Sequence, residues 1–502
     1  MSQTPDAQTP DARTPDARTP DRQFPGEGLP GEDFRAAARA VADLAADYLG
    51  AVADRPVWQP TDDAGRDRLL NAPLPAGGRP LAELLTAIED EVLPYPMGNG
   101  HPRFFGWVNS APAPAGVLAT LAAAAMNPSS AGGDHADVHL ERAVVRWIAE
   151  LVGFPHRPGA GILTSGTSMA TVLCLAAARG RAAREDGWDV RADGLAGMPP
   201  LVAYCTGETH SCVRKAAELL GIGSRRLRTV PTDADGHLDV AALRGAVAAD
   251  RAAGLRPFLV AASAGTVNAG AVDPIDAIAD VCADEGLWLH VDGAYGAFGV
   301  LDPLIAHRYA GMERADSLAL DPHKWLGVPV DCGCALVRDA AELRGTFSLV
   351  PPYLRDEESG GLGWFSEYGM EQTRPFRSLK VWATIAHRGR DGIAADIARC
   401  TALARRLGEL VERDPLLELA APVETSIVAF RHRAPGLPPK AVDALNHDLP
   451  TAVQRRGRAF VTGTVLGGHE ALRACLLNPA TTEADLAILL SEVHAAAADL
   501  AR

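Results

Sequence analysis

The sequence predicts an α/β protein: a mostly parallel sheet covered by helices, preceded by a helical segment and followed by a smaller α+β domain. Two observations carry this prediction. From about Met126 to Trp382, short β-rich runs alternate with helical stretches, which is the pattern of βαβ units in a parallel sheet. Beyond Asp391 a long helical pattern precedes short strands, and 502 residues exceed the roughly 250–300 that one hydrophobic core organises.

The first residues differ in composition from the rest of the chain. From Thr4 to Arg22 a five-residue unit repeats, TPDAQTPDARTPDARTPDR, in which no apolar face can form. A dispensable tail is the simplest interpretation, and a functional tail is the alternative. We therefore predict four parts: a disordered tail over 1–30, an N-terminal helical segment over 31–125, a large domain over 126–390 and a small C-terminal domain over 391–502.

Two amphipathic helices are predicted in the N-terminal segment. Apolar residues recur at three- and four-residue spacing in EDFRAAARAVADLAADYLGAV and in RPLAELLTAIEDEVL, and Pro94 and Pro96 close the second. The aromatic, proline-interrupted stretch HPRFFGWVNSAPAPAG follows, and its composition predicts a loop near a pocket.

The βα pairs of the large domain follow one another in order. AGILTS leads into MATVLCLAAARGRAARE, PLVAYCT into CVRKAAELLGIG, and FLVAASAG into IDAIADVCADEG, after which LWLHVDGAY adds a strand. Ligands of such sheets collect at the carboxyl ends of the strands, where these loops are rich in Gly, Ser, Thr, His and Asp. The helical pattern AADIARCTALARRLGELVER and the strands SIVAFRH and LRACLLN then predict the small domain, ending in a helix.

Composition excludes several classes of protein. The net charge is −15, from 48 basic and 63 acidic residues, which argues against a nucleic acid or an anionic membrane surface as partner. No apolar run reaches the roughly 20 residues of a membrane helix, and no secretory signal is visible at the N-terminus. The eight cysteines form no CxxC pair, so we expect reduced thiols in a cytoplasmic protein.

Lys324 lies in SLALDPHKWLGVPVDCG, between an apolar run and a Gly/Pro/Cys turn. A lysine is costly to bury unless it is paired or neutralised, so Lys324 either snorkels at a strand end or holds its amine for chemistry. Asp292 ends the apolar strand of WLHVDGAYG, 32 residues earlier (324 − 292). Its carboxylate needs a positive partner such as a protonated pyridine nitrogen, with a structural salt bridge or helix cap as the alternative.

Two further pieces lie at other strand ends. LTSGTSMATVL combines a strand, a Gly/Ser/Thr turn and a helix start, whose free N–H groups suit a phosphate or simply begin a capped helix. His210, in ETHSCVRK, could stack on a planar ligand or cap a helix. A phosphate cradle, an acid for a ring nitrogen, a flat side chain and a lysine together predict a pyridoxal 5'-phosphate site, with Lys324 as the covalent anchor.

At these residues the chain is similar to the group II pyridoxal-phosphate decarboxylases, the aromatic-L-amino-acid and glutamate decarboxylase family with the aspartate aminotransferase fold (fold type I). The resemblance runs from about Arg79 into the C-terminal domain. It rests on HPRFFGWVNSAP, TSGTSMAT, ETHSCVRKAAELLGIG, AGTVNAGAVDPI, HVDGAYG, DPHKW and FRSLKVW. It implies decarboxylation of an L-amino acid to the amine and CO₂ by a homodimer, with active sites at the interface and N-terminal helices that wrap around the partner.

The resemblance also implies roles for individual residues. Lys324 would form the Schiff base with the cofactor, Asp292 would pair with the pyridinium nitrogen, and His210 would stack on the ring. The remaining cofactor contacts would be Ala294 on the other ring face, Thr266 near the ring hydroxyl, and Thr167, Ser168 and His323 at the phosphate.

Tyr353, in LVPPYLRDEESGGLGWF, matches the family tyrosine that protonates the substrate carbon after CO₂ leaves. Relatives with phenylalanine there tend toward aldehydes, so Tyr353 favours simple decarboxylation. Two alternatives stay open: an oxidative deaminase that forms an aldehyde, and a cofactor-binding scaffold without activity. An ordinary loop tyrosine is the plainer interpretation of Tyr353 itself.

The expected substrate pocket departs from the aromatic pattern of the family. Asn127, Ser129 and Val330 stand where aromatic decarboxylases carry aromatic or bulky apolar residues, whereas Trp107 and Val108 keep some apolar lining. Ser110 could contact the substrate carboxylate, and Asp321 replaces an asparagine found in many animal relatives. An aromatic amino acid is the first expectation, with a branched-chain or an unusual, hydroxylated amino acid close behind.

One histidine pair could suggest a metal. DHADVH places His135 and His139 four residues apart, as on a zinc-binding helix, but Ala136 stands where a zinc protease has its glutamate. No third ligand is evident in the sequence, so we predict no metal site.

Overall fold

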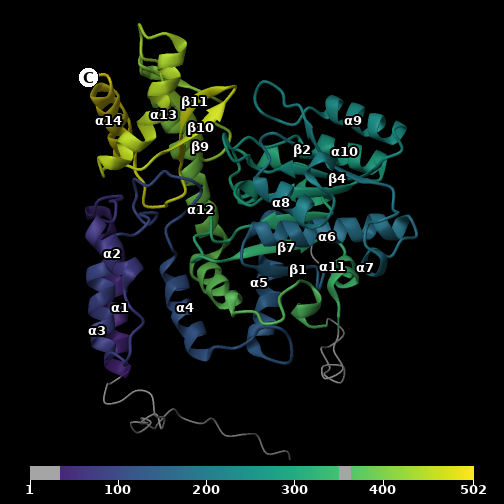
Figure 1. Ribbon diagram of the computed structural model, residues 1–502, viewed down its shortest axis with the longest axis horizontal. Helices are drawn as coiled ribbons and strands as arrows, with labels where there is room; N and C mark the ends of the chain where they lie inside the picture. The colour runs from purple at the N-terminus through teal and green to yellow at the C-terminus, as the bar shows by residue number, and fades with distance from the viewer. Residues whose placement is uncertain (1–33, 156, 350–362) are drawn as a thin grey trace, which may run out of the picture. The chain divides into compact units, whose positions relative to one another are not determined.

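The protein is described from a computed structural model, which covers residues 34–155, 157–349 and 363–502 (Figure 1). The chain falls into two compact units. One contains the residues up to 49 and residues 62–94, and the other contains residues 50–61 and 95–502. The predicted tail over 1–30 lies outside the described residues.

The first unit is helical, as the sequence predicts. Its helices are α1 (Phe34–Ala51), α2 (Asp63–Asn71) and α3 (Leu81–Ala87), the last continuing into the π-helical turn η2 (Ile88–Val92). Asp62 caps α2, because its carboxylate accepts the N–H of Gly65 at 2.6 Å.

A seven-stranded sheet forms the centre of the second unit, in the order β1-β7-β6-β5-β4-β2-β3. The strands are β1 (Gly161–Thr164), β2 (Leu201–Thr206), β3 (Leu227–Val230), β4 (Arg256–Ser263), β5 (Trp288–Asp292), β6 (Ser317–Leu320) and β7 (Gly333–Val337). Only β7 runs against its neighbours among these strands, because it pairs antiparallel with both β1 and β6. The predicted α/β fold with a mostly parallel sheet is therefore confirmed.

Helices cover both faces of this sheet (Figure 1). They are α5 (Ala136–Val152), α6 (Thr167–Glu185), α8 (Ser211–Leu219), α9 (Val240–Ala252), α10 (Ile275–Glu285), α11 (Ala340–Phe347) and the first part of α12 (Arg377–Arg413). Two further helices pack on helices: α4 (Pro114–Met126) on α12 and α7 (Val190–Asp193) on α6. Successive residues of β2 enter opposite cores: Val202 and Tyr204 pack with α5 and α10, whereas Leu201 and Ala203 pack with α6 and α8. Burial on both faces explains why these strands are almost continuously apolar.

The C-terminal part contains a second sheet, antiparallel throughout, in the order β10-β11-β9-β8. Its elements are β8 (Leu417–Leu419), β9 (Ile427–His432), α13 (Pro439–Arg455), β10 (Thr462–Leu466), β11 (His469–Cys475) and α14 (Glu483–Leu500). The expected boundary between 390 and 391 falls inside α12, next to Gly389, whose backbone is non-helical with φ 64°. The four domain limits stay predictions.

Two expectations from composition concern the cysteines and membrane-spanning helices. All eight cysteines are free and buried. Among the described residues, no helix combines the length and the apolar character needed to cross a bilayer.

Candidate active site

Five loops that carry predicted site residues leave the same edge of the large sheet. Strands β2, β4, β5 and β6 run parallel, and β1 has the same direction because β7 is antiparallel to both β1 and β6. The carboxyl ends of these strands therefore meet at one edge, where ligands of α/β sheets bind. The predicted residues there are Thr167 and Ser168 after β1, His210 after β2, Thr266 after β4, Asp292 ending β5, and Lys324 after β6.

Lys324 is half-buried and paired. Its Nζ lies 3.0 Å from Oδ2 of Asp321, with 20% of the lysine side chain and 5% of the aspartate side chain exposed. Lys324 is therefore only partly buried, and its amine is paired with a carboxylate rather than left without a partner. The other carboxylate oxygen of Asp321 accepts the N–H of Thr167 at 2.6 Å, at the N-terminus of α6. Asp321 therefore joins the lysine to the Gly/Ser/Thr turn, where its negative charge also suits the positive end of the helix dipole.

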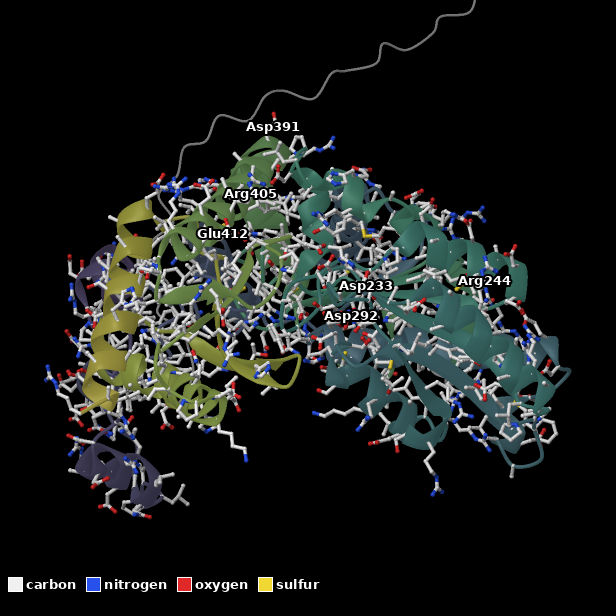
Figure 2. The ribbon with its side chains drawn as sticks, turned by 90° about the horizontal axis from the view of Figure 1, so that it is seen from above. Asp233, Arg244, Asp292, Asp391, Arg405 and Glu412 are labelled. Atoms are coloured by element: carbon white, nitrogen blue, oxygen red, sulfur yellow. The ribbon has the colours of Figure 1, made fainter. Side chains whose placement is uncertain are left out.

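Asp292 is buried at the end of β5, with 7% of its surface exposed (labelled in Figure 2). Oδ1 accepts the N–H of Ala294 at 3.2 Å. Oδ2 accepts the S–H of Cys212 at 3.7 Å. A buried carboxylate must be satisfied in this way, and Asp292 keeps lone pairs for a cationic partner.

His210 is the N-cap residue of α8, since its Nδ1 accepts the N–H of Cys212 at 3.2 Å. Burial lowers the pKa of His210 and Lys324 adds to this effect, while Asp292 and Asp321 oppose it. The sequence left open whether His210 caps a helix or stacks on a ligand. The capping role occurs, and it leaves the imidazole face available.

His323 and Ser110 meet beside the lysine. Nδ1 of His323 donates to the carbonyl of Cys332 at 2.7 Å, which orients the ring. The hydroxyl of Ser110 donates to the backbone carbonyl of His323 at 3.3 Å, and the carbonyl of Ser110 accepts from Asn99 at 2.8 Å. The loop that precedes α4 is therefore tied to the turn that carries Lys324.

The loop with Thr266 is held by the C-terminal sheet. Thr266 is buried, and its hydroxyl accepts the N–H of Ala271 at 3.0 Å. Arg473, from β11, donates to the carbonyls of Val267 and Trp107, each at 2.8 Å. Arg473 thus connects the β4 loop to the aromatic loop before α4.

The turn before α6 fits a phosphate. The Oγ1 atom of Thr167 is buried without a hydrogen-bond partner among the described residues, so it can serve a bound acceptor. A Cβ on Gly166 would lie 3.7 Å from Oδ1 of Asp321 and 3.8 Å from Cε1 of His323, so glycine keeps this corner open. Because Asp321 uses the N–H of Thr167, the threonine would reach a phosphate through its hydroxyl. Ser168 is exposed at the next position.

Metal binding is the alternative use of these groups. His210, Cys212 and Asp292 present ligand atoms within 4.8 Å of one another. Burial, followed by the charge of Asp292, raises the pKa of Cys212 to about 12, whereas a metal site needs the thiolate. The chemistry of this set therefore favours a hydrogen-bonded thiol over a metal ligand. His139, of the histidine pair noted in the sequence, instead contacts the exposed Asp134, with Nε2 2.7 Å from Oδ1.

The predicted pocket residues divide into two groups. Ser110 is buried beside His323, and Trp107 packs on Phe460 with ring centroids 5.3 Å apart, its backbone at φ 44°. Asn127, Ser129 and Val330 are exposed in the single chain, and Asn127 lines a cavity of about 200 Å³ together with Asp331 and Lys380. Val108 is half-buried. Tyr353 lies outside the described residues.

Three contributors to the site were not predicted as such. Asp321 was noted only as a departure from relatives, although a carboxylate three residues before the lysine, at the start of the same turn, is a usable signal. Cys212 follows His210 by two residues and carries no signal of its own. Arg473 comes from the C-terminal sheet, and sequence patterns do not show where that sheet packs against the large one.

Comparisons with known proteins agree over most of the chain. Residues 65–433 match the family described as "Pyridoxal-dependent decarboxylase conserved domain". The chain is 31% identical over 474 residues to the aromatic-L-amino-acid decarboxylase of Bacillus atrophaeus, covering 93% of this chain and 96% of that protein. Two solved structures are similar. Oryza sativa TDC with PLP and tryptamine is 30% identical with a TM-score of 0.87, and the match covers 95% of this chain and 99% of that one. Rhodiola rosea 4-hydroxyphenylacetaldehyde synthase is 26% identical with a TM-score of 0.81, and the match covers 93% of this chain and 98% of that one.

Proposed function

The chain belongs to the pyridoxal-dependent decarboxylase family, and from this premise we propose that it converts an aromatic L-amino acid to the amine and CO₂. The family makes the protein a lyase, an amino acid decarboxylase whose cofactor is pyridoxal 5'-phosphate. The observation that carries the proposal is the meeting of Lys324, Asp292 and the α6 turn at one sheet edge, with Lys324 and Thr167 bridged by one carboxylate.

Lys324 supplies the amine that binds the cofactor covalently in this proposal. When bound, pyridoxal phosphate supplies an aldehyde for the substrate amine and a ring that takes up the electron pair left by departing CO₂. Asp321 holds Nζ of Lys324 at 3.0 Å and so directs the amine toward the α6 turn. Asp292 would hold the proton of the ring nitrogen, and burial of its carboxylate would strengthen that pairing because little water screens it.

The other residues orient the cofactor. Thr167, Ser168 and His323 would hold the phosphate, and Thr266 would approach the ring hydroxyl. His210 and Ala294 would contact the ring from its two faces. The hydrogen bond from Cys212 to Nδ1 supports the role of His210, since it fixes the plane of the imidazole and leaves the proton of the neutral ring on Nε2.

The substrate assignment rests on the pocket. Trp107 packs on Phe460 with the two rings tilted by 49°, and its half-exposed ring offers an apolar surface that favours an aromatic side chain. Ser110 would bind the substrate carboxylate, and Val108 would add apolar lining. The exposed Asn127, Ser129 and Val330 would be covered in a homodimer whose sites lie between subunits, where they would favour a polar or larger substrate. A branched-chain or hydroxylated amino acid is therefore the second substrate class. The homodimer and the cytoplasmic location stay predictions.

An aldehyde-forming reaction is the second candidate function, and the similarity to the 4-hydroxyphenylacetaldehyde synthase of Rhodiola rosea favours it. Tyr353 argues for the amine instead, since a phenolic O–H can return a proton to the substrate carbon before oxygen reacts there.

Product analysis tests the proposal. Purified, cofactor-loaded protein is incubated with a pool of L-amino acids, products are identified by mass spectrometry, and oxygen uptake is followed. An amine without oxygen uptake is expected, and its identity names the substrate class. An aldehyde with peroxide would replace decarboxylation by oxidative deamination. If the protein binds the cofactor but converts no amino acid in the pool, the proposed reaction is contradicted for all of those substrates.

A further inference from the structure

Cys212 connects two residues that the proposed function places against the cofactor ring. Its backbone N–H donates to Nδ1 of His210 at 3.2 Å. Its side-chain Sγ lies 3.7 Å from Oδ2 of Asp292. One residue, at the second position of α8, therefore contacts both the histidine before that helix and the carboxylate at the end of β5.

The thiol of Cys212 remains protonated. Only 2% of the residue is exposed. Burial and the neighbouring charge of Asp292 raise its pKa to about 12, so the sulfur carries a proton at neutral pH. The acceptor for that proton is the carboxylate, since Asp292 when ionised can only accept. Thr171 also contacts the sulfur, with Oγ1 3.6 Å from Sγ, and its hydroxyl can donate to the sulfur while the S–H donates to Asp292.

We propose that Cys212 is a positioning residue of the active site, whose S–H fixes the carboxylate of Asp292 for the ring nitrogen while its N–H fixes the imidazole of His210. This inference rests on the proposed function of Asp292 and His210. Its physical basis is that two donors approach different oxygens of Asp292, Ala294 at Oδ1 and Cys212 at Oδ2. A carboxylate held at both oxygens cannot rotate freely about its last bond.

A thiol can fill this role because its S–H donates to a carboxylate while the residue stays small and apolar enough for an almost fully buried position. A hydroxyl of nearly the same size could orient the carboxylate in the same way. In either case the ionised carboxylate keeps its charge for the ring nitrogen of the cofactor. The competing interpretation is that Cys212 is a small apolar residue that only fills space, which is the usual role of a buried free cysteine.

Three substitutions separate these interpretations. Cys212→Ala removes the donor, Cys212→Val removes it while filling the space, and Cys212→Ser keeps a donor of nearly the same size. The matched control is Cys205→Ala, since Cys205 is also buried, at the end of β2, and makes no contact with Asp292 among the interactions of the described residues. Thermal denaturation of each variant reports its stability independently.

The measurements are the dissociation constant of pyridoxal 5'-phosphate, from titration of the apo protein, and the visible circular dichroism of the bound cofactor. The second depends on how the ring is oriented. We expect Cys212→Ala and Cys212→Val to weaken cofactor binding about tenfold and to diminish the dichroic band, the lower end of what loss of a bond to a charged group causes. Cys212→Ser and Cys205→Ala should stay within about twofold of the parent protein.

Two results would overturn the inference. One is a Cys212→Val variant with the affinity and dichroic band of the parent, which would reduce Cys212 to a space-filling residue. The other is a Cys212→Ser variant as impaired as Cys212→Ala, because a donor would then not suffice. Failure of the proposed function is distinguishable from both, since the parent protein itself would then show no bound cofactor with a dichroic band.

Discussion

The buried ion pair of Glu141 and Arg374 allows the largest stability effect to be predicted. Both side chains are 0% exposed, and the atoms Oε1 and Nη2 are 2.6 Å apart. A second bond joins Oε2 to Nη1 at 3.0 Å. Arg374 also donates to the carbonyls of Ser130 and Leu163, at 3.0 and 2.6 Å. The pair thus joins α5, β1 and the segment before α12, and β1 leads into the turn that carries Thr167.

The perturbation is Glu141→Gln, which preserves shape and removes the negative charge. Breaking a buried pair costs about 3–5 kcal/mol, because the remaining charge stays buried without compensation. The glutamine oxygen still accepts from Arg374, and Oε2 of Glu371 lies 3.8 Å from Nε of Arg374, so we expect the lower end, about 3 kcal/mol. The matched control lies on the same helix: Glu150 pairs with Arg146 at the same 2.6 Å, but their side chains are 57% and 48% exposed. Glu150→Gln should cost no more than about 0.5 kcal/mol.

Urea unfolding of the three proteins measures these differences. Far-UV circular dichroism and tryptophan fluorescence are recorded together, and the free energies are compared where the two transitions coincide. The reasoning is refuted if Glu141→Gln destabilises the protein by less than about 1 kcal/mol, or by no more than Glu150→Gln. In that case, the charge of Arg374 would be compensated by its carbonyl partners and by Glu371, whose Oε2 lies 3.8 Å from Nε of Arg374.

Three further predictions concern activity and pH. Asp292→Asn should keep the cofactor bound but lower kcat by roughly 10²–10³-fold, measured as amine release, because a neutral amide cannot stabilise the ring proton; near-full turnover would contradict the role of Asp292. Tyr353→Phe should shift the product from amine toward aldehyde with oxygen uptake, and an unchanged product ratio would show that the proton comes from another group. Burial lowers the pKa of His237, but its bonds to Asp233 and Glu424 outweigh burial and raise the pKa above 6.5. The stability that protonated His237 contributes is therefore complete below pH 6.5, the pKa of an ordinary histidine, and is lost as the pH rises through the raised pKa of the folded state. His237→Gln should remove this part of the pH dependence of the denaturation midpoint, and parallel pH profiles for variant and parent would contradict it.

The large sheet could be predicted because its signals are local. Each βα pair shows an apolar run, a turn of small polar residues and a helical period within about 30 residues. The position of β7 could not, since an antiparallel strand buried on both faces has the same apolar composition as its parallel neighbours. The start of α12 at Arg377 was missed for a related reason. The non-helical backbone at Gly389 divides the pattern, and the first part buries basic residues, Arg377 and Lys380, on its inner face, which hides its helical period from a reading of apolar residues.

Some site residues are placed by the ends of parallel strands, and others are placed by the path of the turns. Lys324, Asp292 and His210 could be placed at one edge because parallel strands end together, whatever the side chains do. Asp321 is different: its bonds to Lys324 and to the N–H of Thr167 depend on the path of a turn, which has no period to read. Cys212 depends on α8 approaching β5, and the bond from Arg473 to Val267 spans 206 residues between two sheets. Such contacts arise from tertiary packing, which the sequence pattern does not show. They orient Lys324, Asp292 and His210, whose presence at this edge already followed from the direction of the strands.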